Sequence, residues 1–146
     1  MIVNYNPDLE ESLIQGYIKT FAGEPWNEIW EHQWVLDRVR WISSVPNFIG
    51  KVAVENGEVV GALLGYTLPF KGKLNFDIVE LFVLPSSQGN GVGKSLIKEL
   101  EKTLPLDNGN VIHLITAKES DSETFYKKCG YERNEHLCVM AHVGNE

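Results

Sequence analysis

Three glycines within five residues, in the stretch LPSSQGNGVGKSL over residues 84–96, restrict what this chain can fold into. The residues before them indicate a strand over 74–84, and leucines at helical spacing follow over 91–104. Glycines at a strand-to-helix joint let the backbone adopt positive φ and approach an anion closely. The free N–H groups and the dipole of the helix start attract that anion. The stretch predicts a phosphate-binding loop, with a tight turn that binds nothing as the alternative.

Two well-known nucleotide motifs do not fit this stretch. The P-loop pattern G-x-x-x-x-G-K-[ST] ends as Gly93-Lys94-Ser95 does, but it needs a glycine where the chain has Gln88. A P-loop enzyme also needs an acidic residue at the end of another strand to hold Mg²⁺, and the strand expected over 110–117 offers none. The dinucleotide pattern G-x-G-x-x-G fails because Lys94 or Leu96 stands where its third glycine should be.

The remaining periodicity predicts an α/β or α+β fold, a central mixed sheet flanked by helices, in a single domain over residues 1–146. Asn6 and Pro7 suit the start of a first helix. Asn56-Gly57 predicts the turn of a β-hairpin. The other expected elements are strands over 1–5, 48–68 (as the hairpin), 110–117 and 131–142, and helices over 6–21, 27–43 and 121–130.

Charge and composition limit the partners. A net charge of −7 argues against a general role on DNA or RNA, whose binders usually carry a basic face, and weakly favours a cationic partner. No apolar run approaches the roughly 20 residues of a membrane span, and the N-terminus does not resemble a signal peptide. We therefore expect a cytoplasmic protein without a membrane partner, whose Cys129 and Cys138 are reduced thiols without the spacing of a metal site. The oligomeric state stays open, a homodimer included.

The loop does satisfy the pattern Q/R-x-x-G-x-G/A from Gln88 to Gly93, and in this it resembles the GNAT superfamily of N-acetyltransferases. The likeness extends to the preceding strand, to the order of elements and to ETFYKKCGY, which is similar to the late F-Y-x-x-x-G-F/Y signature of that family. Many relatives carry Asn and Ala where this chain has Glu119 and Ser122, so a coenzyme contact at position 119 is not carried over.

The resemblance implies a GNAT fold and the transfer of an acetyl group from acetyl-coenzyme A to an amine, without a metal. It also implies that backbone groups of the strand before the loop bind the pantetheine arm and the acetyl oxygen, while the loop binds the diphosphate. The residues expected to bind the coenzyme are Leu81, Phe82, Val83, Gln88, Gly89, Asn90, Gly91, Val92, Gly93 and Lys94.

Acetyl transfer needs a general base, because an alkylammonium with a pKa of about 10.4 must lose its proton. Glu80 is the candidate, since a carboxylate among apolar residues is disfavoured unless it has a task. It can instead be partly solvated or salt-bridged. Asp77 is a lesser candidate on the other face, unless a bulge reverses the faces. Strict alternation along the strand places the side chains of Phe76, Ile78, Phe82 and Leu84 on the same face as that of Glu80.

Tyr126 is the candidate general acid, because the resemblance places its hydroxyl near the coenzyme sulfur. Beside Phe125, at helical spacing, it can also be a residue of the core. His113 alternates with apolar residues in an expected strand, which is typical of a packed or hydrogen-bonded side chain.

The segment FAGEPWNEIW, residues 21–30, joins the first two expected helices. In the GNAT superfamily, which this chain resembles, that segment usually forms a wall of the acceptor pocket. It sets the carboxylates of Glu24 and Glu28 beside the indoles of Trp26 and Trp30, and both kinds of group attract cations. It also resembles the E-P-W segment of aminoglycoside 6′-N-acetyltransferase-like GNAT proteins. We expect a small cationic amine, an aminoglycoside or a polyamine, to bind Glu24, Trp26 and Asp77.

Several alternatives remain open. The tryptophans can be core anchors behind a helix-breaking Pro25. The acceptor can be a protein N-terminus or a lysine side chain. The chain can also be a non-catalytic domain that binds acyl-coenzyme A and needs neither Glu80 nor Tyr126.

Overall fold

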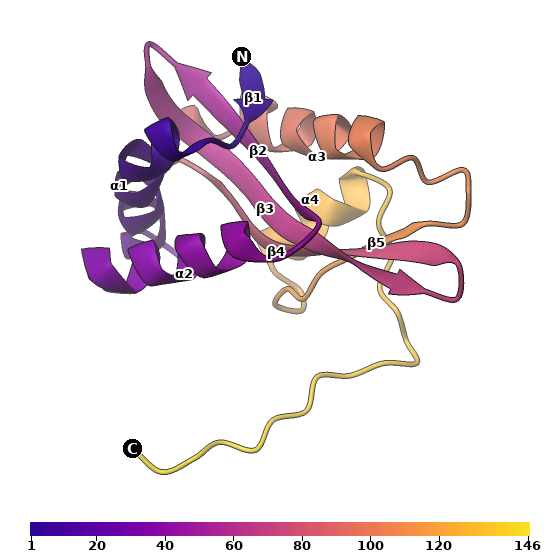
Figure 1. The fold of residues 1–146 in the computed structure, drawn as a ribbon. Helices are drawn as coiled ribbons and strands as arrows, with labels where there is room; N and C mark the ends of the chain where they lie inside the picture. The colour runs from indigo at the N-terminus through magenta and orange to yellow at the C-terminus, as the bar shows by residue number, and fades with distance from the viewer. The chain divides into compact units, whose positions relative to one another are not determined.

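The computed structural model describes residues 1–146, and the backbone contacts divide them into two compact units, Met1–Ile115 and Thr116–Glu146. The first unit holds one five-stranded sheet in the order β1-β2-β3-β4-β5 (Figure 1). Neighbouring strands are antiparallel except β4 and β5, which are parallel, so the mixed sheet expected from the sequence is confirmed. The strands are β1 (Ile2–Asn4), β2 (Phe48–Glu55), β3 (Glu58–Phe70), β4 (Lys73–Val83) and β5 (Val111–His113).

Three helices of the first unit cover the two faces of the sheet. Helices α1 (Glu10–Ala22) and α2 (His32–Ser44) lie on one face, and α3 (Val92–Thr103) lies on the other (Figure 1). None of the helices has the length and apolar character that a membrane span requires. The core on the α1 and α2 face consists of Leu13, Ile14, Tyr17, Val35, Val39, Ile42, Val52, Val59, Ala62, Leu64 and Phe82.

The turns with the strongest local signals form as predicted. The Asn6 side chain accepts a hydrogen bond from the Asp8 N–H at 2.9 Å and caps a short 3₁₀ turn (Pro7–Leu9) that leads into α1. Asn56 and Gly57 join β2 to β3 with φ angles of 51° and 78°, which is the left-handed conformation that a tight hairpin turn needs.

An irregularity in β4 changes which of its side chains share a face. Leu64 of β3 pairs with Glu80, and the next residue, Gly65, pairs with Ile78, so Val79 is an extra residue without a partner. Such a β-bulge interrupts the alternation of side chains along its strand.

The bulge places Asp77 on the same face as Glu80. Their cross-strand partners, Tyr66 and Leu64, are two residues apart on β3 and therefore point to the same side, the side of α1 and α2. Strict alternation predicted that Asp77 lies on the other face of the sheet from Glu80. That prediction is wrong because it did not include the extra residue. For the same reason, the α3 side of the sheet, and not the Glu80 side, carries Phe76 and Ile78.

Two predicted boundaries in the first unit are also wrong. Helix α2 begins at His32, not at residue 27, and Asn27 has a φ of 50°, which a right-handed helix cannot accommodate. Strand β5 is three residues long, where the sequence predicted a strand over 110–117.

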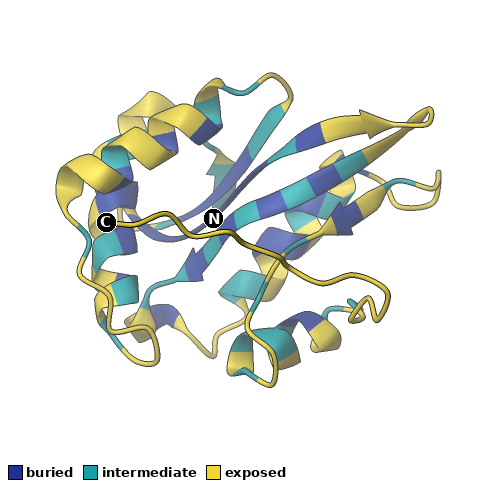
Figure 2. Ribbon diagram, turned by 90° about the horizontal axis from the view of Figure 1, so that it is seen from below, coloured by how far each residue is buried: buried dark blue, intermediate teal, exposed yellow.

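The second unit contains α4 (Asp121–Lys128), whose first turn is capped by the Ser120 side chain, which accepts a hydrogen bond from the Glu123 N–H at 3.1 Å. Gly130, with a φ of 95°, follows the helix as predicted. Residues 131–146 contain no strand, so the predicted strand over 131–142 is wrong. Its apolar side chains, such as Leu137 and Met140, are exposed, and Figure 2 shows the segment that leads to the C-terminus in the colour of exposed residues.

Candidate active site

Glu80 is a buried carboxylate with two hydrogen-bond donors. Its residue is 8% exposed, and one oxygen, Oε1, accepts from the Tyr17 hydroxyl at 3.1 Å and from Nε of Arg38. Burial raises the pKa of Glu80 above its ordinary value, although the charge and hydrogen bond of Arg38 and the hydrogen bond of Tyr17 lower it in part. The other oxygen, Oε2, receives no hydrogen bond from the protein. It is therefore the atom that can accept a proton.

The two donors come from the two helices that cover this face of the sheet. Tyr17 of α1 is buried, and burial, followed by the negative charge of Glu80, raises its pKa, so its hydroxyl remains a donor. The side chain of Arg38 in α2 is 42% exposed, so its guanidinium forms an ion pair with Glu80 while remaining in contact with solvent.

The segment between α1 and α2 lies beside this network. The Trp30 ring packs edge-on against Tyr17 with centroids 5.1 Å apart, and its Nε1 donates to Glu28 at 3.2 Å. The negative charge of Glu28 is one of the influences that raise the pKa of Glu80. The predicted acceptor segment is thus electrostatically coupled to the predicted base.

Two further residues of the segment present a carboxylate and an indole. Trp26 packs against Phe21 with ring centroids 5.1 Å apart and is still 42% exposed. Glu24 accepts a hydrogen bond from Nδ2 of Asn27 at 3.1 Å. Trp26 and Trp30 therefore both pack on aromatic residues of α1, as core anchors would, and Trp26 also keeps exposed surface.

Asp77 lies farther along the same face, opposite Tyr66, whose ring contacts Trp41 of α2 with centroids 6.4 Å apart. Nε2 of His113 in β5 lies 4.0 Å from Oδ1 of Asp77, and both side chains are about half exposed. His113 is therefore exposed near a carboxylate, beyond hydrogen-bond distance, and is not packed in the core.

The edge of β4 that faces away from β3 has no strand beside it past residue 77. Pairing with β5 ends at Asp77 and His113, whereas β4 continues to Val83. The N–H of Leu84 donates to Val60 of β3 at 2.8 Å, so by alternation Leu81 and Val83 direct their backbone groups to the open edge. Nε2 of Gln88 donates to the Val83 carbonyl at 2.9 Å, which leaves the backbone groups of Leu81 and the Val83 N–H for a ligand.

Phe82, between these two residues, is placed differently. Its backbone faces β3, and its ring lies in the core, 5.6 Å from the centroid of Tyr17. Phe82 therefore packs in the core beneath the site, and neither its ring nor its backbone faces the open edge of β4 where a ligand would bind.

The glycine loop has the geometry of an anion-binding turn. Gly89 and Gly91 have φ angles of 83° and 79°, and a Cβ at either position would meet no atom within 4 Å. The first backbone bond of α3 runs from the Ser95 N–H to the Gly91 carbonyl at 3.0 Å, so the N–H groups before it have no acceptor in the helix. An open cradle of N–H groups at a helix start fits a diphosphate. Asn90 lies in the same loop, and Val92, Gly93 and Lys94 form the first turn of α3; their contact with a coenzyme stays a prediction.

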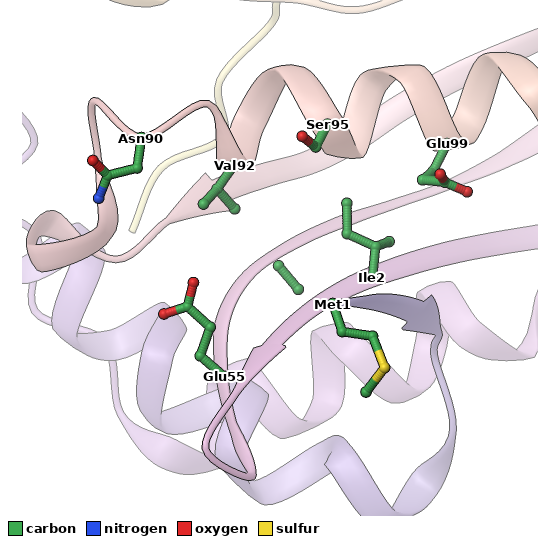
Figure 3. A pocket seen from close by; sticks show the side chains of 8 residues that line it. Met1, Ile2, Glu55, Asn90, Val92, Ser95 and Glu99 are labelled. Carbon is green, nitrogen blue, oxygen red and sulfur yellow. The ribbon is translucent and has the colours of Figure 1, made fainter.

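A cavity of about 360 Å³ borders this loop, between α3 and the edge formed by β1 and β2 (Figure 3). Val92 and Glu55 point into it from its two sides (Figure 3). It lies on the α3 face of the sheet, whereas Glu80 faces α1 and α2, so the cavity is not the site of the predicted base. Its lining consists of Met1, Ile2, Ala53, Glu55, Asn90, Val92, Ser95 and Glu99.

Tyr126 belongs to the second unit, in α4. It is 8% exposed, and its ring lies 5.1 Å from that of Phe125 and 5.7 Å from that of Tyr131, measured between centroids. Tyr126 is thus packed against aromatic neighbours inside its own unit, as expected if it is a core residue. Its role as a general acid stays a prediction.

Two residues of the Glu80 network could not be identified as functional from the sequence. Tyr17 follows the apolar spacing of α1, a pattern typical of a core residue, and it does belong to the core. Arg38 is one of several charged residues in α2, and neither its type nor its spacing indicates a buried partner.

Solved structures that share the fold over nearly the whole chain include three aminoglycoside acetyltransferases. One is meta-AAC0020 from an uncultured soil metagenomic sample, in complex with trehalose, with 20% identity, a TM-score of 0.73 and coverage of 99% of this chain and 96% of that chain. Another is AAC(6')-Iy in complex with the bisubstrate analogue CoA-S-monomethyl-acetylneamine, with 18% identity, a TM-score of 0.73 and coverage of 99% and 98%. The third is AAC(6')-IG from Acinetobacter haemolyticus, with 12% identity, a TM-score of 0.76 and coverage of 99% of each chain.

At these identities the structural likeness establishes the fold alone. The family assignment comes from residues 13–131, which match the Acetyltransferase (GNAT) family. The matched range contains β4, the glycine loop and the F-Y-x-x-x-G-Y signature on which the resemblance in the sequence rested. The chain therefore belongs to the GNAT family and is an acetyltransferase.

Proposed function

We propose that the protein transfers an acetyl group from acetyl-coenzyme A to a primary amine of a small cationic acceptor, such as an aminoglycoside or a polyamine. The observation that carries the proposal is Glu80, a buried carboxylate with one oxygen held and the other without a donor, beside a segment of carboxylates and indoles. The family supplies the reaction class, and the arrangement around Glu80 supports a cationic acceptor.

The coenzyme would be bound mainly by backbone groups. The N–H groups at the start of α3 suit the diphosphate, because the helix dipole and the unsatisfied donors act together there. The open edge of β4 at Leu81 and Val83 suits the amide-bearing pantetheine arm, as a sheet edge suits a peptide. Gln88 would act indirectly, by tying the loop to the end of β4.

The proposed reaction joins the amine nitrogen to the acetyl carbon and breaks the bond from that carbon to the coenzyme sulfur. The ammonium proton passes to Oε2 of Glu80, directly or through water. Tyr126 gives a proton to the departing thiolate, and the second proton that the nitrogen loses on forming the amide returns through solvent to Tyr126. A general base with a raised pKa suits this task, because it takes a proton more readily than an ordinary carboxylate.

The acceptor segment supports a cation in particular. Carboxylates of Glu24 and Glu28 attract ammonium groups, and an exposed indole such as Trp26 binds a cation with roughly 0.5–2 kcal/mol. Several ammonium groups on one small molecule would interact with several of these side chains at once. Asp77, on the same face as Glu80, adds another carboxylate.

The proposal is tested with a panel of acceptors at fixed acetyl-coenzyme A: aminoglycosides, linear polyamines, a lysine peptide, a peptide with a free N-terminus, and neutral or anionic amines. Release of free coenzyme thiol is followed for each. We expect the polycationic small molecules to give the highest kcat/KM. Preference for a peptide or for neutral or anionic amines would contradict the proposed acceptor. Binding of acetyl-coenzyme A without transfer to any amine would indicate a non-catalytic domain.

Glu24→Gln and Trp26→Ala should each raise KM for the polycationic amine by about 5- to 20-fold, because each removes one attraction for a cation. KM for acetyl-coenzyme A should stay within about twofold, and added salt should raise the amine KM of the wild type by screening. Steady-state kinetics measure both constants. Glu58→Gln, at the exposed start of β3, is the matched control. Equal rises in both KM values would show that the segment affects the whole site rather than the acceptor.

Tyr126→Phe should lower kcat by about tenfold or more at neutral pH, because the thiolate then leaves without an acid. The Kd of acetyl-coenzyme A, measured by calorimetry, should stay near the wild-type value. Tyr5→Phe, in the first unit, serves as the control for loss of a tyrosine hydroxyl. A normal kcat in Tyr126→Phe would assign the proton donation to another group or to water.

A further inference from the structure

Arg38 contacts Glu80 in a way that neither the family match nor the proposed reaction explains. Its Nε donates to Oε1 of Glu80, the same oxygen that the Tyr17 hydroxyl holds at 3.1 Å. Both donors therefore act on one oxygen, and Oε2 receives neither bond. Both helices that cover this face of the sheet hold the carboxylate, α1 through Tyr17 and α2 through Arg38.

We propose that Arg38 is a positioning residue for the base: it fixes one oxygen of Glu80, keeps the buried carboxylate ionised, and leaves the second oxygen to take the acceptor's proton. The inference rests on the proposed function, in which Glu80 is the base. Arg38 acts through Glu80 and need not touch the substrate.

The charges around Glu80 explain why a cation is needed there. Desolvation is the largest influence on Glu80, and it favours the protonated, neutral form, which cannot act as a base. Glu28, from the segment between the helices, adds a negative charge that acts in the same direction. Tyr17, from α1, is a neutral donor. Among these neighbours, only Arg38, from α2, carries a positive charge that favours the ionised form.

The position of Arg38 also suits a group that holds the base without closing the site. Its side chain is 42% exposed, whereas that of Glu80 is 9% exposed. The guanidinium therefore spans from solvent to the buried carboxylate. A bidentate pair would occupy both oxygens, but the single Nε contact occupies one.

The direct test is the carboxyl ¹³C resonance of Glu80, identified by its loss in Glu80→Gln and titrated with pH. In Arg38→Gln the midpoint should rise by about one pH unit or more, because an opposite charge at contact distance lowers a carboxyl pKa by roughly 1–3 units. Arg38→Lys keeps the charge, so its midpoint should stay closer to that of the wild type than the Gln variant does. Arg40→Gln is the matched control, because Arg40 lies on the same helix but pairs with Glu10 at 3.1 Å.

The pH profile then links the resonance to the reaction. The acidic limb of kcat/KM should move upward in Arg38→Gln by the same amount as the Glu80 midpoint. For each pH unit by which the limb moves upward, kcat/KM should fall tenfold at pH values below the Glu80 midpoint. It should change little at pH values well above that midpoint. A merely structural role would lower the rate at every pH alike.

An unchanged midpoint or an unmoved acidic limb in folded Arg38→Gln would overturn the proposal. A wild-type measurement covers the case in which this variant does not fold. The Arg38 Nε–H resonance should shift with the same midpoint as the Glu80 carboxyl, and an Nε–H resonance that does not respond to that titration would also overturn it. If no amine is acetylated, the proposed function fails, and the two resonances still decide whether Arg38 keeps Glu80 ionised.

Discussion

Glu80→Gln should lower kcat/KM for the amine by about 10²- to 10⁴-fold at neutral pH, which is the usual contribution of a general base. The amide keeps the shape of the side chain but cannot accept the ammonium proton. Initial rates between pH 6 and pH 10 measure the effect. The matched control is Glu10→Gln, which removes a carboxylate that also pairs with an arginine of α2, Arg40. A Glu80→Gln rate equal to that of the wild type would exclude Glu80 as the base.

The pH dependence of this variant follows from the direction of the Glu80 pKa. Because burial raises that pKa, the wild-type rate should increase with pH through an acidic limb above about 4.3, the value of an ordinary glutamic acid. The variant should lack this limb. Its rate should instead climb toward pH 10, where the amine loses its proton unaided, so the difference from wild type should narrow at high pH.

Gly91→Val should weaken acetyl-coenzyme A binding by about tenfold or more. Gly91 has a φ of 79° at the start of α3, and a β-branched side chain is strained in that conformation and would project where the diphosphate must approach. Calorimetry measures the Kd in a variant whose fold is checked by circular dichroism.

Gly57→Val separates strain from binding. Gly57 has a φ of 78° in the turn between β2 and β3, and a Cβ there also meets nothing within 4 Å. Both variants should therefore lose similar stability, and only Gly91→Val should lose affinity. Unchanged affinity in folded Gly91→Val, or an equal loss in Gly57→Val, would show that the loop is not the coenzyme site.

Features specified by neighbouring residues were predictable from the sequence. The Asn56-Gly57 turn, the start of α3 after the glycine loop and Gly130 after α4 each depend on backbone conformations that few residue types adopt. The mixed sheet followed from the order of these elements. The family resemblance came from such local signals too, and the family match includes them.

Features that depend on contacts across the fold were not predictable. The bulge at Val79 is defined by pairing between β3 and β4, and it alone brings Asp77 onto the Glu80 face. The approach of Arg38 to Glu80 depends on how α2 packs on the sheet. The segment predicted as a strand over 131–142 contains a short apolar run at 137–141, but a strand also requires a partner that pairs with its backbone.

One measurement tests the account most directly, because it follows both the transfer of the acetyl group and the role of Glu80 as the general base. Wild type, Glu80→Gln and Glu10→Gln are incubated with acetyl-coenzyme A and a polycationic amine at neutral pH, and the acetylated amine is quantified by mass spectrometry. We predict one acetyl group gained per coenzyme thiol released in wild type and Glu10→Gln, and product lower by at least about a hundredfold in Glu80→Gln. Equal product in all three proteins, or coenzyme bound with no acetylated amine in any, would contradict it.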